Sequence, residues 1–402
     1  MLRNISFSPP DISGLEINEV VEAMKSGWIT TGPRTKSFEH KIAEYVSVPS
    51  AVCFNSATAA MEMTLRVLGV GPGDEVITSA YTYTASASVI HHVGAKIVLV
   101  DTANDSYEMD YGKLADAITG NTKVIIPVDI GGVMCDYNAI IDVVESKKKH
   151  YHPRSKLQSL FDRPVIMSDA AHSFGSTYHG EKSGTAVDFT CFSFHAVKNL
   201  TTAEGGAAVW PDKPGLDNSM LYEQFQLYSL HGQNKDAAAK LRPGAWEYDI
   251  VLPGYKCNMT DLTAALGIKQ LERFDSLVAR RREIAEIYDR TLLNTDVQRL
   301  DHNHLDRQGN YHLYLVRIPG ITSDIRNEII IQMAENGIAC NVHFKPLPLM
   351  TAYKKLGFDI ADFPNAYRQY ENVISLPMHT LISNDDAEYV TTTFSNIIKE
   401  YK

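Results

Sequence analysis

The most informative stretch of the sequence is Phe192-Ser193-Phe194-His195-Ala196-Val197-Lys198-Asn199-Leu200-Thr201-Thr202-Ala203-Glu204-Gly205-Gly206. Within it, Lys198 follows an aromatic, strand-like run and precedes a pair of glycines. A lysine beside a buried strand is costly unless it is paired, covalently modified or deprotonated, because desolvation lowers its pKa from about 10.4. A deprotonated amine can form a Schiff base. Lys198 is therefore a candidate reactive amine, the alternative being a surface lysine whose stem covers apolar neighbours.

Short β-branched runs alternate with helical patterns on both sides of this stretch. The strand candidates are Ala51–Phe54, Glu75–Thr78, Lys96–Val100, Lys123–Val128, Val165–Ser168, Phe189–Phe194 and Ala207–Trp210. The helical patterns between them include Thr58–Leu68, Tyr83–His92, Tyr111–Ile118 and Tyr137–Glu145. Several strand candidates are apolar on both faces of the pleat, which is typical of parallel strands covered by helices. The alternation predicts an α/β domain with a mostly parallel sheet.

The pattern changes after about Gly254. The later elements are a long helix at Asp261–Leu293, a strand at His312–Ile318, a helix at Ser323–Asn336 and a strand at Ile338–Phe344. We therefore expect a large α/β domain over residues 1–254. A linking helix and a smaller C-terminal α+β domain follow over residues 255–402.

Composition excludes several classes of protein. Of the 402 residues, 44% are hydrophobic and 21% are charged, which is ordinary for a globular protein and too apolar for a disordered one. The formal net charge of −10 argues against broad binding to nucleic acid, which needs a basic surface. The five cysteines are scattered and form no CxxC pair, and no run of about 18 apolar residues or signal peptide is present. We expect a cytoplasmic protein without membrane or nucleic-acid partners.

Two further segments carry groups that suit a phosphorylated cofactor. Asp169 ends the strand-like run from Val165, where α/β sheets place ligand-binding groups, although it could also be a helix cap. Small residues at Ser56-Ala57-Thr58-Ala59 open a helix, whose first N–H groups suit a phosphate or an ordinary N-cap. Together, Asp169 and Lys198 indicate pyridoxal phosphate, because its sites pair a Schiff-base lysine with an aspartate on the pyridine nitrogen.

These motifs together identify a family. The matching segments are Ser26–Pro33, Ser56–Ala59, Gly73–Thr78, Asp169–His172, Phe192–Gly206, Pro253–Asp261 and Ser375–Pro377. Over nearly its whole length the chain resembles the DegT-type sugar aminotransferases, which are pyridoxal-phosphate enzymes of the aspartate-aminotransferase-like fold type I. Within that family it looks most similar to the UDP-4-amino-4-deoxy-L-arabinose–oxoglutarate aminotransferases.

The resemblance implies roles for individual residues. The catalytic residues would be Lys198 as the Schiff-base lysine, Asp169 as the partner of the pyridine nitrogen and His172 beside it. The remaining cofactor contacts would be Tyr83, stacked on the pyridine ring, and the phosphate contacts Ala57, Thr58, Ser193 and Asn258. Asn258 would reach in from the neighbouring subunit of a homodimer with shared active sites. The substrate side would be formed by Trp28, Thr30 and Thr31 at the entrance and by His343.

The resemblance also implies a reaction. L-Glutamate would give its amino group to the cofactor, leaving 2-oxoglutarate and pyridoxamine 5'-phosphate as the intermediate form. A nucleotide-activated keto-sugar, most simply a 4-keto-sugar, would then receive the amino group for lipopolysaccharide or another cell-surface glycan. The alternatives are a 3-keto-sugar aminotransferase and a non-catalytic binding or regulatory protein. Dehydratases of this fold replace the lysine with histidine, so Lys198 argues against that activity.

Three features fit no part of this assignment. The basic segment Ser146–Arg163 is either an exposed insertion or a phosphate contact. Asp129-Ile130-Gly131-Gly132 departs from the usual family pattern after its strand, and we expect both segments to lie at positions open to substrate-facing loops. The histidines His302, His304 and His312, like the pair at 91 and 92, match no standard metal-ligand spacing, so no metal is expected.

Overall fold

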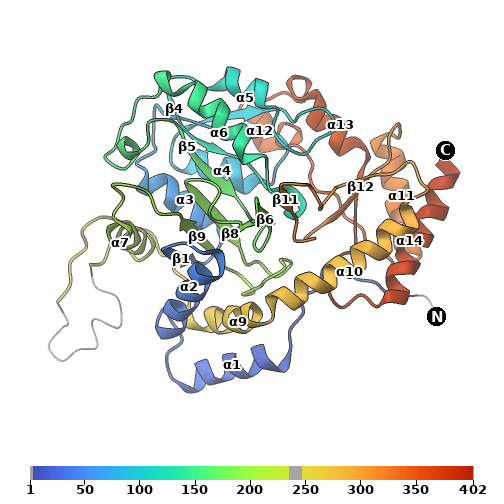
Figure 1. The fold of residues 1–402 in the computed structure, drawn as a ribbon, viewed down its shortest axis with the longest axis horizontal. Coiled ribbons are helices and arrows are strands. Elements are labelled where there is room, and N and C mark those ends of the chain that lie inside the picture. The colour runs from blue at the N-terminus through green and yellow to red at the C-terminus, as the bar shows by residue number, and fades with distance from the viewer. Residues whose placement is uncertain (1–2, 235–246, 402) are drawn as a thin grey trace.

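The computed structural model describes residues 3–234 and 247–401 (Figure 1). Its helices are α1 (Gly14–Lys25), α2 (Pro33–Val46), α3 (Ala57–Val67), α4 (Thr84–His92), α5 (Tyr111–Ala117), α6 (Tyr137–Ser146), α7 (Asn218–Ser229), α9 (Asp261–Glu272), α10 (Phe274–Leu292), α11 (Ser323–Glu335), α12 (Thr351–Lys355), α13 (Pro364–Asn372) and α14 (Asn384–Ile398). Its strands are β1 (Ser50–Phe54), β2 (Glu75–Ser79), β3 (Lys96–Val100), β4 (Thr122–Ile126), β5 (Val165–Asp169), β6 (Thr177–Tyr178), β7 (Glu181–Lys182), β8 (Phe189–Ser193), β9 (Gly206–Trp210), β10 (Gln298–Arg299), β11 (Arg307–Gln308), β12 (Tyr314–Arg317) and β13 (Val373–Leu376).

The central sheet confirms the predicted fold class. It has seven strands in the order β1-β9-β8-β5-β4-β2-β3, and each corresponds to a strand predicted from the sequence. The contacts from β3 through β8 are parallel, whereas β9 runs antiparallel to both β8 and β1. Because β9 is reversed, it begins at the edge of the sheet where the other strands end.

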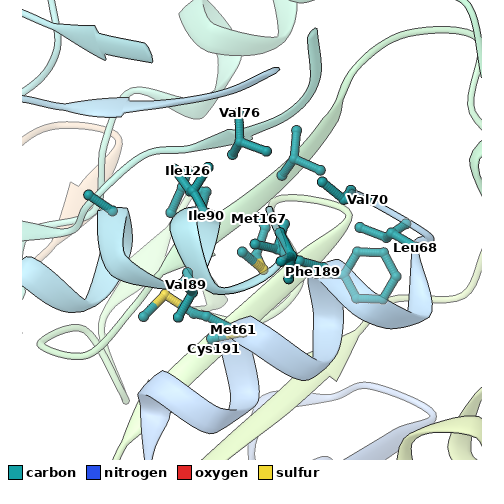
Figure 2. Packing of buried hydrophobic residues seen from close by; sticks show 14 of the residues in the cluster. Met61, Leu68, Val70, Val76, Val89, Ile90, Ile126, Met167, Phe189 and Cys191 are labelled. Atoms are coloured by element: carbon teal, nitrogen blue, oxygen red, sulfur yellow. The ribbon is translucent and has the colours of Figure 1, made fainter. Parts of the chain in front are cut away.

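Alternating side chains of the strands form separate cores on the two faces of the sheet. In β1, Val52 and Phe54 join the cluster under α3, α4 and α7, whereas Ala51 and Cys53 join the cluster under α2 and α9. Figure 2 shows the first of these cores, in which Met61 and Val89 from the helices meet side chains of the strands. The sheet is therefore covered by helices on both faces, which explains its continuous apolar runs.

The C-terminal part has a core of its own. A three-stranded antiparallel sheet, β10-β12-β13, packs with α10, α11 and α14 around residues such as Ile329, Val316 and Phe394. In Figure 1, α10 runs from beneath the central sheet to this smaller group of elements. The hydrophobic core of the C-terminal part is thus separate from the cores beside the central sheet. The domain boundary at residue 254 stays a prediction. No helix in the described ranges, 3–234 and 247–401, has the length and apolarity that crossing a bilayer would need.

Two sequence expectations in this part were wrong. The single helix predicted over Asp261–Leu293 is broken at Arg273, whose φ of −114° and ψ of 8° separate α9 from α10. Arg273 there binds the carboxylates of Glu16 and Asp11, which attaches α1 to the break. Residues 338–344 form no strand and make only isolated bridges, Ile338 with Ile5 and Asn341 with Ser375. The strand beside them is β13, which was not predicted.

The basic segment Ser146–Arg163 lies at the wrong edge of the sheet to face a substrate. Arg154 binds Asp74, immediately before β2 begins, with an Nη1–Oδ1 distance of 2.9 Å. Gln158 is completely buried and donates to the carbonyl of Leu68. The segment is thus anchored at the amino-terminal edge of the parallel strands, so the expectation that it faces the substrate was wrong. Its lysines at 148 and 149 are exposed.

A buried carboxylate fixes the start of α2. Asp261 is fully buried and accepts hydrogen bonds from the backbone N–H groups of Gly32, Arg34 and Thr35 and from the Thr35 hydroxyl, at 2.8–3.0 Å. The N-cap residue of α2, Gly32, has no side chain, so Asp261 supplies the cap from α9. The carboxylate therefore joins α9 to the segment that leads into α2.

We predict that Asp261→Ala lowers the free energy of unfolding by about 2–4 kcal/mol, because it leaves buried N–H groups of α2 without an acceptor. Urea unfolding followed by circular dichroism measures the change. Glu272→Ala on the same helix is the control, since its ion pair with Lys269 is exposed and should contribute less than about 1 kcal/mol. Equal effects of the two substitutions would contradict the capping role.

Candidate active site

A cavity of about 460 Å³ lies at the carboxyl-terminal edge of the parallel strands. Segments that follow four strands of the sheet meet there, together with Glu204 and Gly205, which directly precede β9. Eight of the predicted site residues line it: Ala57, Thr58, Tyr83, Asp169, His172, Ser193, Lys198 and His343. The structure therefore brings together residues that span 287 positions of the sequence, from 57 to 343.

Lys198 is placed by a tight turn after β8. Its backbone N–H donates to the carbonyl of His195, and its side chain enters the cavity that Asp169 also lines. Burial lowers the pKa of the Lys198 amine to about 8, and the Asp169 charge opposes part of that shift. A substantial fraction of this amine is therefore neutral near pH 7 to 8, as a nucleophile requires.

Asp169 is a buried carboxylate that lacks an ion pair in the described ranges. Only 4% of the residue is exposed, and its oxygens accept from the Ser86 hydroxyl at 2.6 Å and from the Ala171 N–H at 3.2 Å. Burial raises its pKa, whereas the two hydrogen bonds and the Lys198 charge lower it. A buried carboxylate in this state is stabilised by a cationic N–H group that enters the cavity.

His172 is held by the segment that departs from the family pattern. The backbone N–H of Gly131 donates to His172 Nδ1 at 3.1 Å, so a neutral ring carries its proton on Nε2. Gly131 and Gly132 have φ values of 70° and 97°, and a Cβ on Gly132 would lie 1.9 Å from Asn310 Oδ1. Gly131 and Gly132 therefore permit the close packing of this segment against His172 and Asn310, and the expectation that the segment faces the substrate stays a prediction.

The start of α3 forms the opposite end of the cavity. The Ser56 side chain caps this helix by accepting from the Ala59 N–H, which leaves the first N–H groups, at Ala57 and Thr58, facing outward. A Cβ on Gly206 would lie 2.4 Å from the Ala57 nitrogen, so this glycine lets β9 begin directly against the helix. Such a helix terminus suits a phosphate.

Sequence reasoning missed other residues of the cavity wall. Phe7 stacks on the ring of His343 at 5.6 Å, Ser8 binds the Val197 carbonyl, and Phe344 lies 5.8 Å from His172. His312 lines the cavity as well. The early Phe7-Ser8 pair carries no periodic signal, and its position follows from the pairing of Ile5 with Ile338.

Four predicted site residues form a separate group outside this cavity: Trp28, Thr30, Thr31 and Asn258. The Asn258 amide binds the Thr31 hydroxyl, Thr31 binds the Met259 carbonyl, and the Trp28 indole donates to the Thr31 carbonyl at 3.0 Å. The Asp261 N–H donates to the Thr30 carbonyl. The group is exposed near Ile29 and Tyr255, which are 53% and 39% exposed.

The chemical groups that line the cavity suit pyridoxal phosphate. Asp169 offers a carboxylate to a protonated ring nitrogen, Lys198 offers an amine to an aldehyde, and the start of α3 offers N–H groups to a phosphate. Tyr83, 61% exposed, offers an aromatic face at the cavity wall. The described residues contain no cluster of histidine, cysteine and acidic side chains suited to a metal ion.

Comparison with known proteins assigns the family. A model described as the DegT/DnrJ/EryC1/StrS aminotransferase family matches residues 10–395. The spore coat polysaccharide biosynthesis protein SpsC of Bacillus subtilis is 37% identical, over 98% of this chain and 97% of its own.

Solved structures agree with this assignment. Spr1654 from Streptococcus pneumoniae, described as a sugar aminotransferase and solved in a PMP-form, is 53% identical with a TM-score of 0.97 over 99% of this chain and 100% of its own. Its PLP-form superposes with a TM-score of 0.96 at 52% identity over the whole of both chains. PseC from Helicobacter pylori, an aminotransferase involved in the biosynthesis of pseudoaminic acid, is 27% identical with a TM-score of 0.86, over 99% of this chain and 100% of its own. The chain belongs to the DegT/DnrJ/EryC1/StrS aminotransferase family.

Proposed function

We propose that the protein is a pyridoxal-phosphate-dependent sugar aminotransferase that moves the amino group of L-glutamate to a nucleotide-activated keto-sugar. The observation that carries the proposal is the placement of Lys198, with its pKa lowered to about 8, and buried Asp169 in one cavity. The PLP-form and PMP-form of the 53%-identical Spr1654 support this cofactor.

The residues that bind the cofactor have separable tasks in this reaction. When bound, pyridoxal phosphate supplies an electron sink that stabilises negative charge at the donor Cα. Lys198 binds the cofactor covalently and, once its amine is released, moves the proton from that Cα. Asp169 holds a proton at the ring nitrogen, which its buried charge favours. The N–H groups of Ala57 and Thr58, with the Ser193 hydroxyl, hold the phosphate.

His172 and Tyr83 orient the cofactor in this scheme. Because Gly131 occupies His172 Nδ1, the Nε2–H group is the donor that remains for the cofactor ring. Burial, with the nearby Lys198 and His343, lowers the pKa of His172 well below its usual value, so the ring stays uncharged. Tyr83 covers one face of the ring by stacking.

The proposal also specifies the class of sugar and the carbon that receives the amino group. SpsC is named for spore coat polysaccharide biosynthesis and PseC for pseudoaminic acid biosynthesis, which supports an amino-sugar for a cell-surface glycan. The resemblance to UDP-4-amino-4-deoxy-L-arabinose–oxoglutarate aminotransferases supports amination at C4, with C3 as the alternative. A non-catalytic binding protein would have no need of a buried lysine with a lowered pKa, so Lys198 favours the enzyme.

We propose that two copies of the chain share their active sites. Trp28, Thr31 and Asn258 lie outside the cavity of their own chain and are linked to one another. The apolar side chains Ile29, Ile250, Val251 and Tyr255, which lie near this group in the sequence, are 39–53% exposed. Exposed apolar side chains gathered beside a polar group are typical of an interface. In the dimer, Asn258 of one copy contacts the phosphate in the cavity of the other, and Trp28, Thr30 and Thr31 line its entrance.

Covalent attachment of the cofactor should depend on the protonation of Lys198. For cofactor-free protein mixed with pyridoxal phosphate, we predict a rate that rises about tenfold per pH unit below pH 8 and levels off above it, because the neutral amine is the nucleophile. Stopped-flow absorbance in the visible range measures this rate.

The Lys198→Ala variant should show neither the visible band nor turnover, with a loss of activity of about 1,000-fold or more. Lys269→Ala, on the outer surface of α9 beside Glu272, is the matched control and should behave like the unaltered protein. Near-normal transamination by Lys198→Ala would remove Lys198 from the mechanism.

Mixing two inactive variants tests whether the sites are shared. Lys198→Ala and Asn258→Ala subunits, unfolded and refolded together in equal amounts, should regain about a quarter of full activity, because half the dimers are mixed and each holds one intact site. If Asn258 served the cavity of its own chain, no mixed dimer would contain an intact site, and activity would stay at the level of the separate variants.

A substrate panel tests the proposed function itself. The protein is incubated with L-glutamate carrying an isotope-labelled amino group and with UDP-, GDP- and dTDP-linked 3-keto- and 4-keto-sugars. We expect mass spectrometry to find the label in one class of nucleotide-sugar and NMR to place it at C4. Labelled product at C3 would select the alternative, and L-glutamate that leaves the cofactor unconverted would refute the aminotransferase activity. The same panel with Lys198→Ala is the control.

A further inference from the structure

His312 lines the same cavity, yet the proposed mechanism gives it no task. It precedes β12 in the C-terminal part of the chain, and only 4% of the residue is exposed. Its ring lies 4.5 Å from the ring of His172, centroid to centroid, at an angle of 49°. His302 and His304, which neighbour it in the sequence, do not line this cavity. Of the histidines considered for a metal site, His312 is the one that the fold brings to the reactive lysine.

The hydrogen bonds around Asn199 determine which nitrogen of His312 carries the proton. The Asn199 Nδ2 group donates to the backbone carbonyl of Asn310 at 2.8 Å, so its Oδ1 is the atom that faces His312. His312 Nδ1 lies 3.1 Å from that oxygen and must be the donor. In the uncharged ring, Nε2 therefore keeps an unprotonated lone pair, on the side of the ring away from Asn199.

The segment that carries His312 is held at several points. The His312 backbone N–H donates to Asn310 Oδ1 at 3.0 Å, and the Asn310 amide donates to the carbonyls of His172 and Phe174 at 2.7 and 2.8 Å. Arg281, which is 4% exposed, donates to the His312 carbonyl at 3.4 Å. These contacts fix the position and the orientation of the His312 ring, as a residue that binds a substrate requires.

The two neighbouring histidines, which both line the cavity, thus keep opposite groups free on Nε2. His172 has its Nδ1 occupied by the Gly131 N–H and keeps the proton on Nε2, where it is a donor. His312 has its Nδ1–H bound to Asn199 and keeps a lone pair on Nε2, where it is an acceptor. Burial, together with the nearby Lys198 and Arg281, lowers the pKa of His312 well below its usual value, so the lone pair stays free of a proton.

We propose that His312 is a substrate-binding residue whose Nε2 accepts a hydrogen bond from a hydroxyl group of the sugar substrate. This inference rests on the proposed function and adds a recognition residue for the sugar half of the reaction. A sugar presents hydroxyl donors around its reacting carbonyl carbon, whereas the carboxylates of the amino donor present acceptors only. An uncharged acceptor therefore favours the sugar and gives no attraction to a carboxylate.

Two substitutions separate this role from a structural one. In His312→Asn the amide occupies the place of Nδ1, so the contact with Asn199 can persist while the Nε2 acceptor is lost. In His312→Gln the amide oxygen can reach the place of Nε2, while the contact with Asn199 is lost. If Nε2 binds the sugar, His312→Asn should be the more damaging change, and if the ring only holds Asn199, His312→Gln should be.

The two half-reactions are measured separately with purified, cofactor-loaded protein. The first is the conversion of the bound cofactor by L-glutamate, followed by absorbance. The second is the reverse conversion by whichever UDP-, GDP- or dTDP-linked keto-sugar of the panel the unaltered protein aminates. For His312→Asn we expect kcat/KM for the keto-sugar to fall about 10- to 100-fold, the range for a lost hydrogen bond that leaves a buried hydroxyl unpaired. Its half-reaction with L-glutamate should change less than about threefold, and His312→Gln should recover part of the sugar reaction.

His302→Asn is the matched control, because His302 is also 4% exposed and lies outside the cavity with its Nε2 near the Leu313 carbonyl. It should leave both half-reactions intact. Equal losses in the two half-reactions of His312→Asn, or a greater loss in His312→Gln, would overturn the assignment of Nε2 to the sugar. A protein that reacts with L-glutamate and with no keto-sugar would refute the proposed substrate class and this assignment with it, whereas failure with L-glutamate would refute the aminotransferase function.

Discussion

The site depends on one geometric constraint, the common edge at which parallel strands end. Asp169 ends β5, Lys198 follows β8, and the start of α3 follows β1, so three distant segments deliver a carboxylate, an amine and a set of N–H groups to one cavity. The reversed strand β9 begins at this edge, and its Gly206 permits contact with the first turn of α3. This cavity is where an α/β sheet of this kind binds ligands.

Burial gives these groups their chemistry. Desolvation lowers the pKa of Lys198 to about 8 and raises that of Asp169, so each group is less charged than it would be in water. Such an amine can react with an aldehyde, and such a carboxylate stabilises a protonated ring nitrogen. The nearby imidazoles of His172 and His312 are uncharged for the same reason, and backbone or amide contacts set one as a donor and the other as an acceptor.

Family membership and the residues of the site both indicate an aminotransferase, but neither defines the sugar. The cofactor end of the cavity is made of motifs that are recognisable in the sequence, from Ser56 to Gly206. Another part of the cavity wall is made of Phe7, His312, His343 and Phe344, which come from the start of the chain and from its C-terminal part. Aminotransferases that share one cofactor chemistry can therefore differ in substrate through segments that lie far from the cofactor motifs.

The sequence by itself determined the seven strands of the central sheet, because each is a short, largely apolar or β-branched run between helical patterns. It also predicted that Lys198, Asp169 and the start of α3 form one site, since these groups lie near strand ends and carry local signals. Only the tertiary structure decided the break at Arg273, the irregular course of residues 338–344 and the position of the basic segment at the far edge of the sheet. It alone brought His312 beside His172 and fixed its tautomer through Asn199. These features depend on contacts between residues far apart in the sequence, which no local periodicity records.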